Sequence, residues 1–110
     1  MARRGEQRAR KGCGNVFQDL GLPGAKEHLI KAQIVAEISR ITKGRKLTQA
    51  KAGAEMGVTQ PEVSRMLRGE FREYSVERLL GFLTAFERDV EIVIRRRKKG
   101  GQGAVSVVAA

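Results

Sequence analysis

A mainly helical domain with a single C-terminal β-strand is the fold that the sequence predicts, and three observations lead to it. The chain has 110 residues, 41% of them apolar, which is enough for one small core but not for two. Aromatic residues make up only 5% and Trp is absent, so an aliphatic core is expected, which favours helices over an aromatic-rich β-sandwich. Isoleucines recur with helical period at positions 30, 34, 38 and 41.

The excess of positive charge is concentrated at the two ends of the chain. Lys and Arg outnumber Asp and Glu by 22 to 12, and residues 1–14 and 95–99 hold net charges of +4 and +5. We therefore expect residues 1–14 to form a disordered basic tail, residues 15–95 the folded domain, and residues 96–110 a flexible tail rich in basic residues and Gly. Such tails suit phosphate contacts and, equally, a solvated and solubilising role.

Several function classes are excluded by what the sequence lacks. No apolar run approaches ~18 residues, so no transmembrane helix is expected, and no apolar stretch follows the first residues as a secretory signal would require. Cys13 is the only cysteine, which excludes an internal disulfide and fits a reducing, cytoplasmic location. Without a nucleophile–base pair, metal-ligand spacing or a Gly-rich loop after a strand, we expect no catalysis and no metal or cofactor.

The first helix is expected over residues 23–43. Pro23 is tolerated in a first turn, and Gly44 is a candidate for a left-handed cap at the other end. Residues 15–20 could form a short extended arm or one more turn, and their pattern does not decide between the two.

Two short helices joined by a tight turn are expected next. Thr48 is the N-cap of the first, and Gly57 ends it with the positive φ that a sharp turn requires. Thr59 is the N-cap of the second, with Glu62 at the capping-box position and Gly69 as its end. A shared apolar core is expected to hold the pair together: Leu47, Ala52, Met56, Val58, Val63 and Leu67.

The second helix of this pair presents a polar outer face, which consists of Pro61, Ser64, Arg65 and Arg68, with Gln60 beside it. Its inward face is Val63, Met66 and Leu67. Two helices joined in this way form a helix-turn-helix, whose second helix enters the major groove of DNA.

A fourth helix and a strand complete the predicted domain. Ser75 is the expected N-cap of the helix, which runs to about Phe86. Apolar residues alternate at Val90, Ile92 and Ile94, which predicts a strand over residues 89–95. A lone strand leaves its backbone groups unpaired. Its partner is expected to be either the N-terminal arm around residues 16–17 or the same strand of a second copy.

The stretch from Leu47 to Gly69 resembles the Xre and phage-repressor class of helix-turn-helix proteins. Leu-Thr-Gln at the second helix, Gly-Val-Thr-Gln at the turn and Val-Ser-Arg-Met-Leu-Arg-Gly at the end of the third are typical of that class. The resemblance implies a lambda-repressor-like bundle of about four to five helices that binds operator DNA. The unpaired strand over residues 89–95 separately leads us to expect a dimer.

A wider resemblance, over about residues 15–95, is to the HigA-like Xre antitoxins encoded beside RelE/HigB-type toxins. It rests on residues 15–23, Phe71, residues 75–80 and the closing residues 89–92. It implies a bacterial, nucleoid-associated repressor with a cognate toxin as a second partner.

Two departures from the family pattern matter. Ala52-Gly53 stands where the second helix usually has Leu-Ala. Ala52 thins the core, and Gly53 costs about 1 kcal/mol relative to Ala inside a helix unless it permits a closer helix approach. Pro61 occupies a position where related repressors often place a base-reading side chain, and proline cannot hydrogen-bond a base edge.

The candidate site residues follow from their chemistry. Base reading is expected of Gln60, Ser64 and Arg65, since Gln pairs bidentately with adenine and Arg with guanine. Contacts to DNA phosphates are expected of Thr48, Gln49, Thr59, Lys43, Arg45, Lys46 and Arg68. The dimer strand is expected to use Val90, Ile92 and Ile94.

Three functions fit these observations. The first is a dimeric repressor that binds its own operator and also neutralises an mRNA-cleaving toxin. The second is a toxin-neutralising protein-interaction module with weak DNA binding. The third is a stand-alone phage-type regulator without a toxin.

Overall fold

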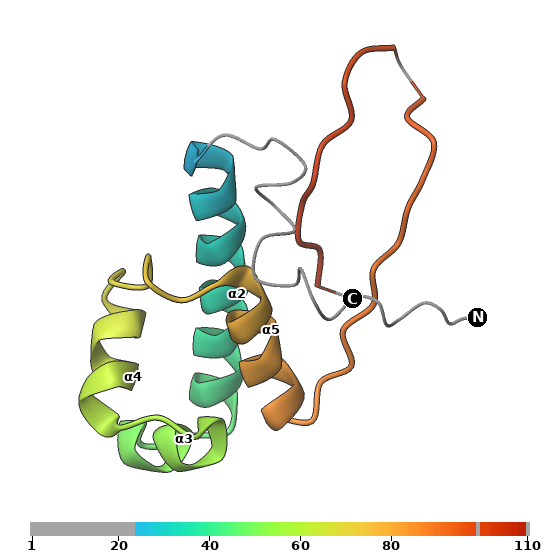
Figure 1. The fold of residues 1–110 in the computed structure, drawn as a ribbon. Helices are drawn as coiled ribbons and strands as arrows, with labels where there is room; N and C mark the ends of the chain where they lie inside the picture. The colour runs from blue at the N-terminus through green and yellow to red at the C-terminus, as the bar shows by residue number, and fades with distance from the viewer. Residues whose placement is uncertain (1–23, 99, 110) are drawn as a thin grey trace.

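The computed structural model describes residues 24–98 and 100–109, and within them it contains four helices (Figure 1). They are α2 (Gly24–Gly44), α3 (Gln49–Met56), α4 (Gln60–Leu67) and α5 (Val76–Ala85). The expectations for the tail 1–14, for the arm 15–20 and for Pro23 lie outside the described residues. No helix of the described part is long and apolar enough to cross a membrane. The mainly helical fold class is confirmed.

The long helix α2 is the spine of the domain, because α5 and α4 both pack on it while α3 packs on α4. All four isoleucines of the predicted stripe are buried, at positions 30, 34, 38 and 41. One expectation about the core is wrong. It is not purely aliphatic, since Phe71, Tyr74, Phe82 and Phe86 are all buried. A low aromatic content describes the average of the chain, whereas these rings gather at α5 and the loop before it.

The predicted caps of the later helices are confirmed. The hydroxyl of Thr48 accepts a hydrogen bond from the Lys51 N–H at 3.1 Å, and that of Ser75 accepts one from the Arg78 N–H at 3.0 Å. These side chains satisfy backbone N–H groups that have no partner within their own helix.

The expected left-handed cap at Gly44 is wrong. Helix α2 includes Gly44, and the left-handed residue is Lys46, with a φ of 56°. Lys46 donates its backbone N–H to the Lys43 carbonyl at 3.1 Å and Leu47 donates to the Thr42 carbonyl at 2.9 Å. This is the Schellman pattern, in which the apolar residue after the left-handed one returns to the core. Packing of Leu47 therefore decides where α2 ends.

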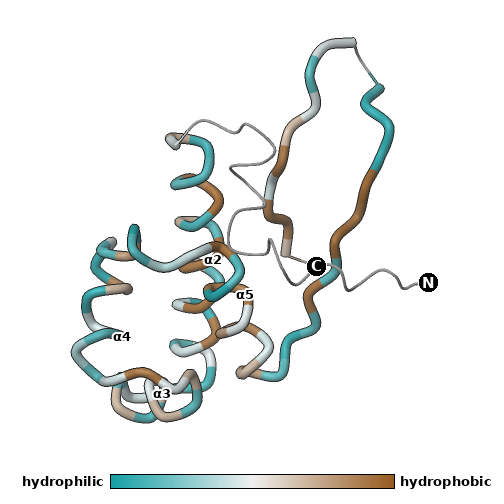
Figure 2. The backbone as a smooth tube through the Cα atoms, viewed as in Figure 1, coloured by the Kyte–Doolittle hydropathy of each residue, from teal (hydrophilic) through white to brown (hydrophobic). Residues whose placement is uncertain are grey.

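The predicted strand over residues 89–95 is absent from the described chain. Helix α5 ends in a left-handed turn at Glu87, with a φ of 65°, and the residues that follow form an extended arm that pairs with no other described segment. Val90, Ile92 and Ile94 are exposed, and the arm stands clear of the helices in Figure 2, where its apolar residues are brown. A strand is defined by its hydrogen-bonded partner, and alternation of side chains cannot supply one.

The C-terminal segment returns to the helices. The backbone N–H of Val107 donates to the Gln33 side chain at 3.2 Å, and Val107 packs half-buried against the core. The sequence pattern did not indicate this contact.

Candidate nucleic-acid interface

The turn between α3 and α4 is closed by Gly53 and Gly57. The backbone N–H groups of Gly57 and Val58 both donate to the Gly53 carbonyl, at 2.8 and 2.9 Å, and Gly57 has a φ of 79°. A Cβ on Gly53 would lie 2.6 Å from the Val58 carbonyl oxygen and 3.3 Å from Val63 Cγ2. Gly53 therefore permits the close approach of α3 to the turn and α4, as its position in the sequence predicted.

The N-terminus of α4 is held by the predicted capping box. The Thr59 hydroxyl accepts from the Glu62 N–H at 3.3 Å, and the Glu62 carboxylate accepts from the Thr59 N–H at 2.8 Å. The carboxylate also accepts from the Thr59 hydroxyl at 3.1 Å. The hydrogen bonds that it accepts from Thr59, first from the backbone N–H and then from the hydroxyl, lower the pKa of Glu62. Pro61 fits in this first turn because its missing N–H has no intrahelical role there.

The outer face of α4 is polar, as predicted. Gln60, Arg65 and Arg68 are exposed and Ser64 is half-buried. On the opposite face Val63 and Met66 are buried, but Leu67 is only half-buried against the core. Met66, which is 0% exposed, and Val63, which is 1% exposed, therefore anchor α4 more than Leu67 does.

Two glutamines join the N-terminal turns of α3 and α4. The Gln60 amide donates to the Gln49 amide oxygen at 3.0 Å. This arrangement leaves one N–H and the oxygen of Gln60 free, together with both N–H groups of Gln49. Sequence reasoning selected both residues but missed their pairing. A signal existed, since each glutamine directly follows the N-cap threonine of its helix.

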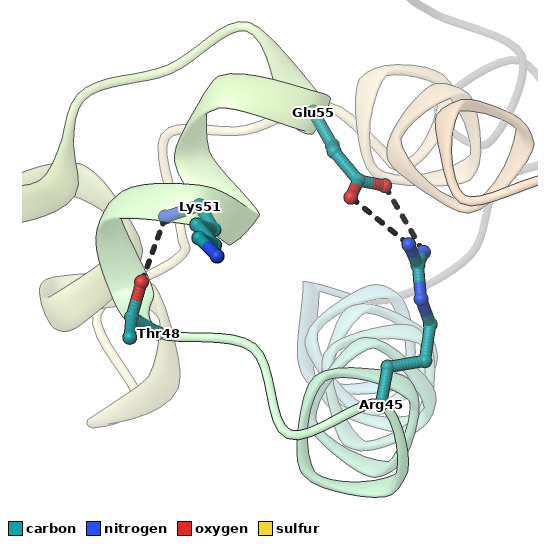
Figure 3. Close-up of polar contacts among 4 residues, drawn as sticks. All are labelled: Arg45, Thr48, Lys51 and Glu55. Carbon is teal, nitrogen blue, oxygen red and sulfur yellow. Dashed lines mark hydrogen bonds and ion pairs between the residues drawn. The ribbon is translucent and has the colours of Figure 1, made fainter.

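The arginines expected at the site differ in the hydrogen bonds and ion pairs that their guanidinium groups form. Arg65 forms no ion pair and no side-chain hydrogen bond with the described residues, whereas Arg68 donates to the Ser64 hydroxyl at 3.2 Å. Arg45 forms a two-pronged ion pair with Glu55, with both N–O distances 3.0 Å (Figure 3). Its guanidinium also lies 5.8 Å from the Phe86 ring centroid. Arg45 therefore ties the end of α2 to α3 and to the core after α5.

A groove lies between the α2–α3 turn and α4. The groove is lined by the polar residues Lys43, Lys46 and Gln49 and by the apolar residues Ala52 and Leu67. Both lysines are exposed. First-turn N–H groups at a helix N-terminus have no intrahelical partner and favour anions. The groove therefore brings two free positive charges beside the N-terminus of α3, which is the arrangement that the predicted phosphate contacts require.

Comparison with known proteins agrees with this geometry. Residues 16–95 match a family model described as a helix-turn-helix domain. A solved structure named as an XRE-family transcriptional regulator is 37% identical, with a TM-score of 0.75, over 80% of this chain and the whole of that one. No curated protein matches the chain. The chain belongs to the XRE family of helix-turn-helix proteins.

Proposed function

We propose that this protein is a sequence-specific DNA-binding transcriptional repressor. The observation that supports this function best is the paired Gln49 and Gln60 at the exposed N-terminal ends of α3 and α4. A free amide edge on Gln60 suits adenine, and the remaining N–H groups of Gln49 suit a backbone phosphate. Nothing in a solvated helix face requires two amides to be joined in this way.

The roles proposed for the other residues depend on whether their side chains already have a partner among the described residues. Arg65 is exposed and unengaged among the described residues, so it is the proposed guanine reader, while Ser64 contacts a base or the backbone. Lys43, Lys46 and the N-cap residues Thr48 and Thr59 are the proposed phosphate contacts. Arg45 and Arg68 belong to the same set, and Arg45 would have to bind phosphate while paired with Glu55.

The active form that we propose is a homodimer. Two copies related by a two-fold axis would bind a palindrome whose half-sites lie about 34 Å apart, one helical turn of DNA. The expected operator is the promoter of the protein's own operon, bound in the cytoplasm on the bacterial nucleoid.

The test is a gel-shift titration with the promoter upstream of this gene and a scrambled duplex of equal length. Arg65→Ala should cost ~1–3 kcal/mol on the promoter and much less on the scrambled DNA. Arg40→Ala is the matched control, because it removes the same charge from α2, where Arg40 pairs with Glu37. Equal losses on both duplexes would contradict base reading by Arg65.

We also propose an antitoxin role, which is supported by the wider sequence resemblance at Phe71 and residues 75–80. Its test is coexpression with the reading frame beside this gene. Rescue of growth from a short RelE-type toxin, and copurification with it, would support the role. Loss of rescue in a variant that still binds the promoter would separate toxin binding from DNA binding. If the neighbouring reading frame is not toxic, the result would favour a stand-alone regulator. If the protein rescues growth but does not shift the promoter, the result would favour a protein-interaction module.

A further inference from the structure

The arm after α5, residues 89–97, holds apolar side chains that are exposed in the part of the chain that the structure describes. The exposed fractions are 40% for Val90, 85% for Ile92, 61% for Val93 and 92% for Ile94. An extended, apolar and unpaired segment of this kind is an edge that pairs readily with another strand. Its backbone is already extended, so pairing would need little rearrangement of the domain.

The charges of the arm alternate with its apolar residues and change sign along it. In an extended chain, odd-numbered residues share one face and even-numbered residues the other. The odd face has Asp89 and Glu91 at its start, Val93 at its centre, and Arg95 and Arg97 at its end. None of these four charged residues forms an ion pair with a described residue, and all four are exposed.

We infer that this arm pairs with the arm of a second copy, antiparallel, about a two-fold axis at Val93. Val93 then faces its own equivalent. Glu91 faces Arg95 of the second copy and Asp89 faces Arg97 of the second copy, and symmetry repeats both ion pairs. On the even face Ile92 faces Ile94 of the second copy, again twice, and Val90 faces Arg96, which is the one apolar residue of the arm set against a basic one in this register. Opposite charges and β-branched residues directly across from one another both stabilise a strand pair.

Other registers place fewer of these residues opposite a residue of opposite charge or a second apolar residue. An axis at Ile92 keeps only the pairing of Asp89 with Arg95 and places Glu91 across from Val93. An axis at Ile94 places Glu91 across from Arg97 and Asp89 across from Lys99, but it sets three apolar residues against basic ones: Val90 against Lys98, Ile92 against Arg96 and Val93 against Arg95. Parallel pairing in register sets each charge against its own copy, which is destabilising. The partner that this surface fits is therefore the same chain, in one register.

The inference deepens the proposed homodimer and rests on it. It adds the residues of the interface, and it predicts that residues 89–97 pair neither with the N-terminal arm nor with an unrelated protein.

The register can be tested by disulfide formation. In a Cys13→Ser background, the single variants Val93→Cys and Ile92→Cys are oxidised mildly and compared on non-reducing gels. Directly opposite residues lie about 4.5–5.5 Å apart, within the ~4.4–6.8 Å range between Cα atoms that a disulfide spans. Residue 92 and its own equivalent would be offset by two positions and too distant. We expect the disulfide with Val93→Cys only; a disulfide with Ile92→Cys only, or with neither variant, would overturn the inference.

Charge reversal provides an independent test. Glu91→Arg and Arg95→Glu should each weaken dimerisation on the order of tenfold, measured by sedimentation equilibrium, and the double variant should restore it. With the axis at Ile92 or Ile94 these two residues do not face each other, so a double variant weaker than either single one would overturn the register.

The promoter gel shift on the same samples separates the two proposals. A disulfide-linked dimer that fails to shift the promoter would contradict the proposed function while the pairing stands. A promoter shift by wild-type protein whose arms do not cross-link at residue 93 would contradict the pairing while the proposed function stands.

Discussion

At the scale of single residues, the helix-turn-helix depends on side chains that are small or that pair with one another. Gly53 is needed because the Val58 carbonyl oxygen lies only 2.6 Å from where a Cβ would be. Gln49 and Gln60 are paired, because the Gln60 amide donates a hydrogen bond to the Gln49 amide oxygen. Both features depend on distances between residues, which helix propensity and residue type alone do not contain.

Gly53→Ala should destabilise the domain. In an unhindered helix, Ala is favoured over Gly by about 1 kcal/mol, but here the added methyl would lie 2.6 Å from a backbone oxygen. Overpacking of this kind typically costs ~1–3 kcal/mol. Denaturant unfolding provides the measurement, with Gly81→Ala as the control, since a Cβ on Gly81 in α5 meets nothing within 4 Å. A stabilised Gly53→Ala would show that α3 and the turn are not in close contact.

Gln49 and Gln60 should be coupled in operator binding. Gln60→Ala removes a base contact and should cost ~1–3 kcal/mol. Gln49→Ala removes a phosphate contact and also the partner that orients Gln60. The double variant should lose less affinity than the two single losses added together, because they share one interaction. Strict additivity in filter binding would mean that the two amides act separately on DNA.

At the scale of elements, the short helices depend on their N-caps and on the side chains that they bury in the core. The caps at Thr48, Thr59 and Ser75 were predictable, because capping is a local interaction with a known spacing. The end of α2 was not, since the Schellman turn forms where Leu47 reaches the core. The inner face of α4 was predicted as Val63, Met66 and Leu67 without a ranking, and the structure buries Met66 more deeply than Leu67. A rotation of less than one residue about the helix axis decides which side chain is central.

Met66→Ala should therefore destabilise the domain far more than Leu67→Ala. Truncation of a fully buried Met to Ala typically costs ~2–5 kcal/mol. Leu67 is only half-buried in the folded state, so its truncation removes less buried apolar surface. Thermal unfolding of the two variants, monitored by far-UV circular dichroism, ranks them. Equal shifts in Tm would mean that α4 is rotated from the orientation described.

The capping box of α4 should make stability depend on pH. Hydrogen bonds from Thr59 lower the pKa of Glu62 in the folded state, so the ionised carboxylate stabilises the fold above its unfolded pKa of about 4.5. This contribution is lost as the pH falls through the folded pKa. The advantage of wild type over Glu62→Gln should shrink as the pH falls below that unfolded value and through the lower folded pKa, and unfolding curves at a series of pH values measure it. An advantage that is constant with pH would contradict the role of the charge.

At the scale of the whole molecule, the proposed base-reading face of α4 and the basic arm beyond α5 are separate parts of the chain. The even face of the arm adds Arg96 and Lys98 to the apolar residues. In the proposed dimer these two charges take no part in the ion pairs of the odd face, so they are available to phosphates. Contacts of this kind strengthen binding to all sequences alike and make it depend on salt.

Replacing Arg96 and Lys98 together by Gln should weaken binding to promoter and scrambled DNA by the same factor. The slope of log affinity against log salt should fall by about 0.9 for each phosphate that the variant no longer binds. Lys26→Gln with Arg40→Gln is the matched control, with the same charge change on α2. If the Arg96 and Lys98 variant changes the ratio between the two DNAs, then the arm contributes to base reading.

The amino-acid sequence alone was enough for everything that depends on neighbours in the chain. Helical period, N-caps, the glycine of the turn and the polar face of α4 all follow from spacings of a few residues, and these define the helix-turn-helix. Contacts between distant segments followed only from packing in three dimensions: the Gln49–Gln60 pair, the Arg45–Glu55 bridge, the aromatic part of the core and the return of Val107 to α2. Residues 89–95 show the limit of what a sequence pattern can predict. Alternation of apolar and polar residues is compatible with a strand, but only a partner with matching hydrogen-bonding groups makes the segment one.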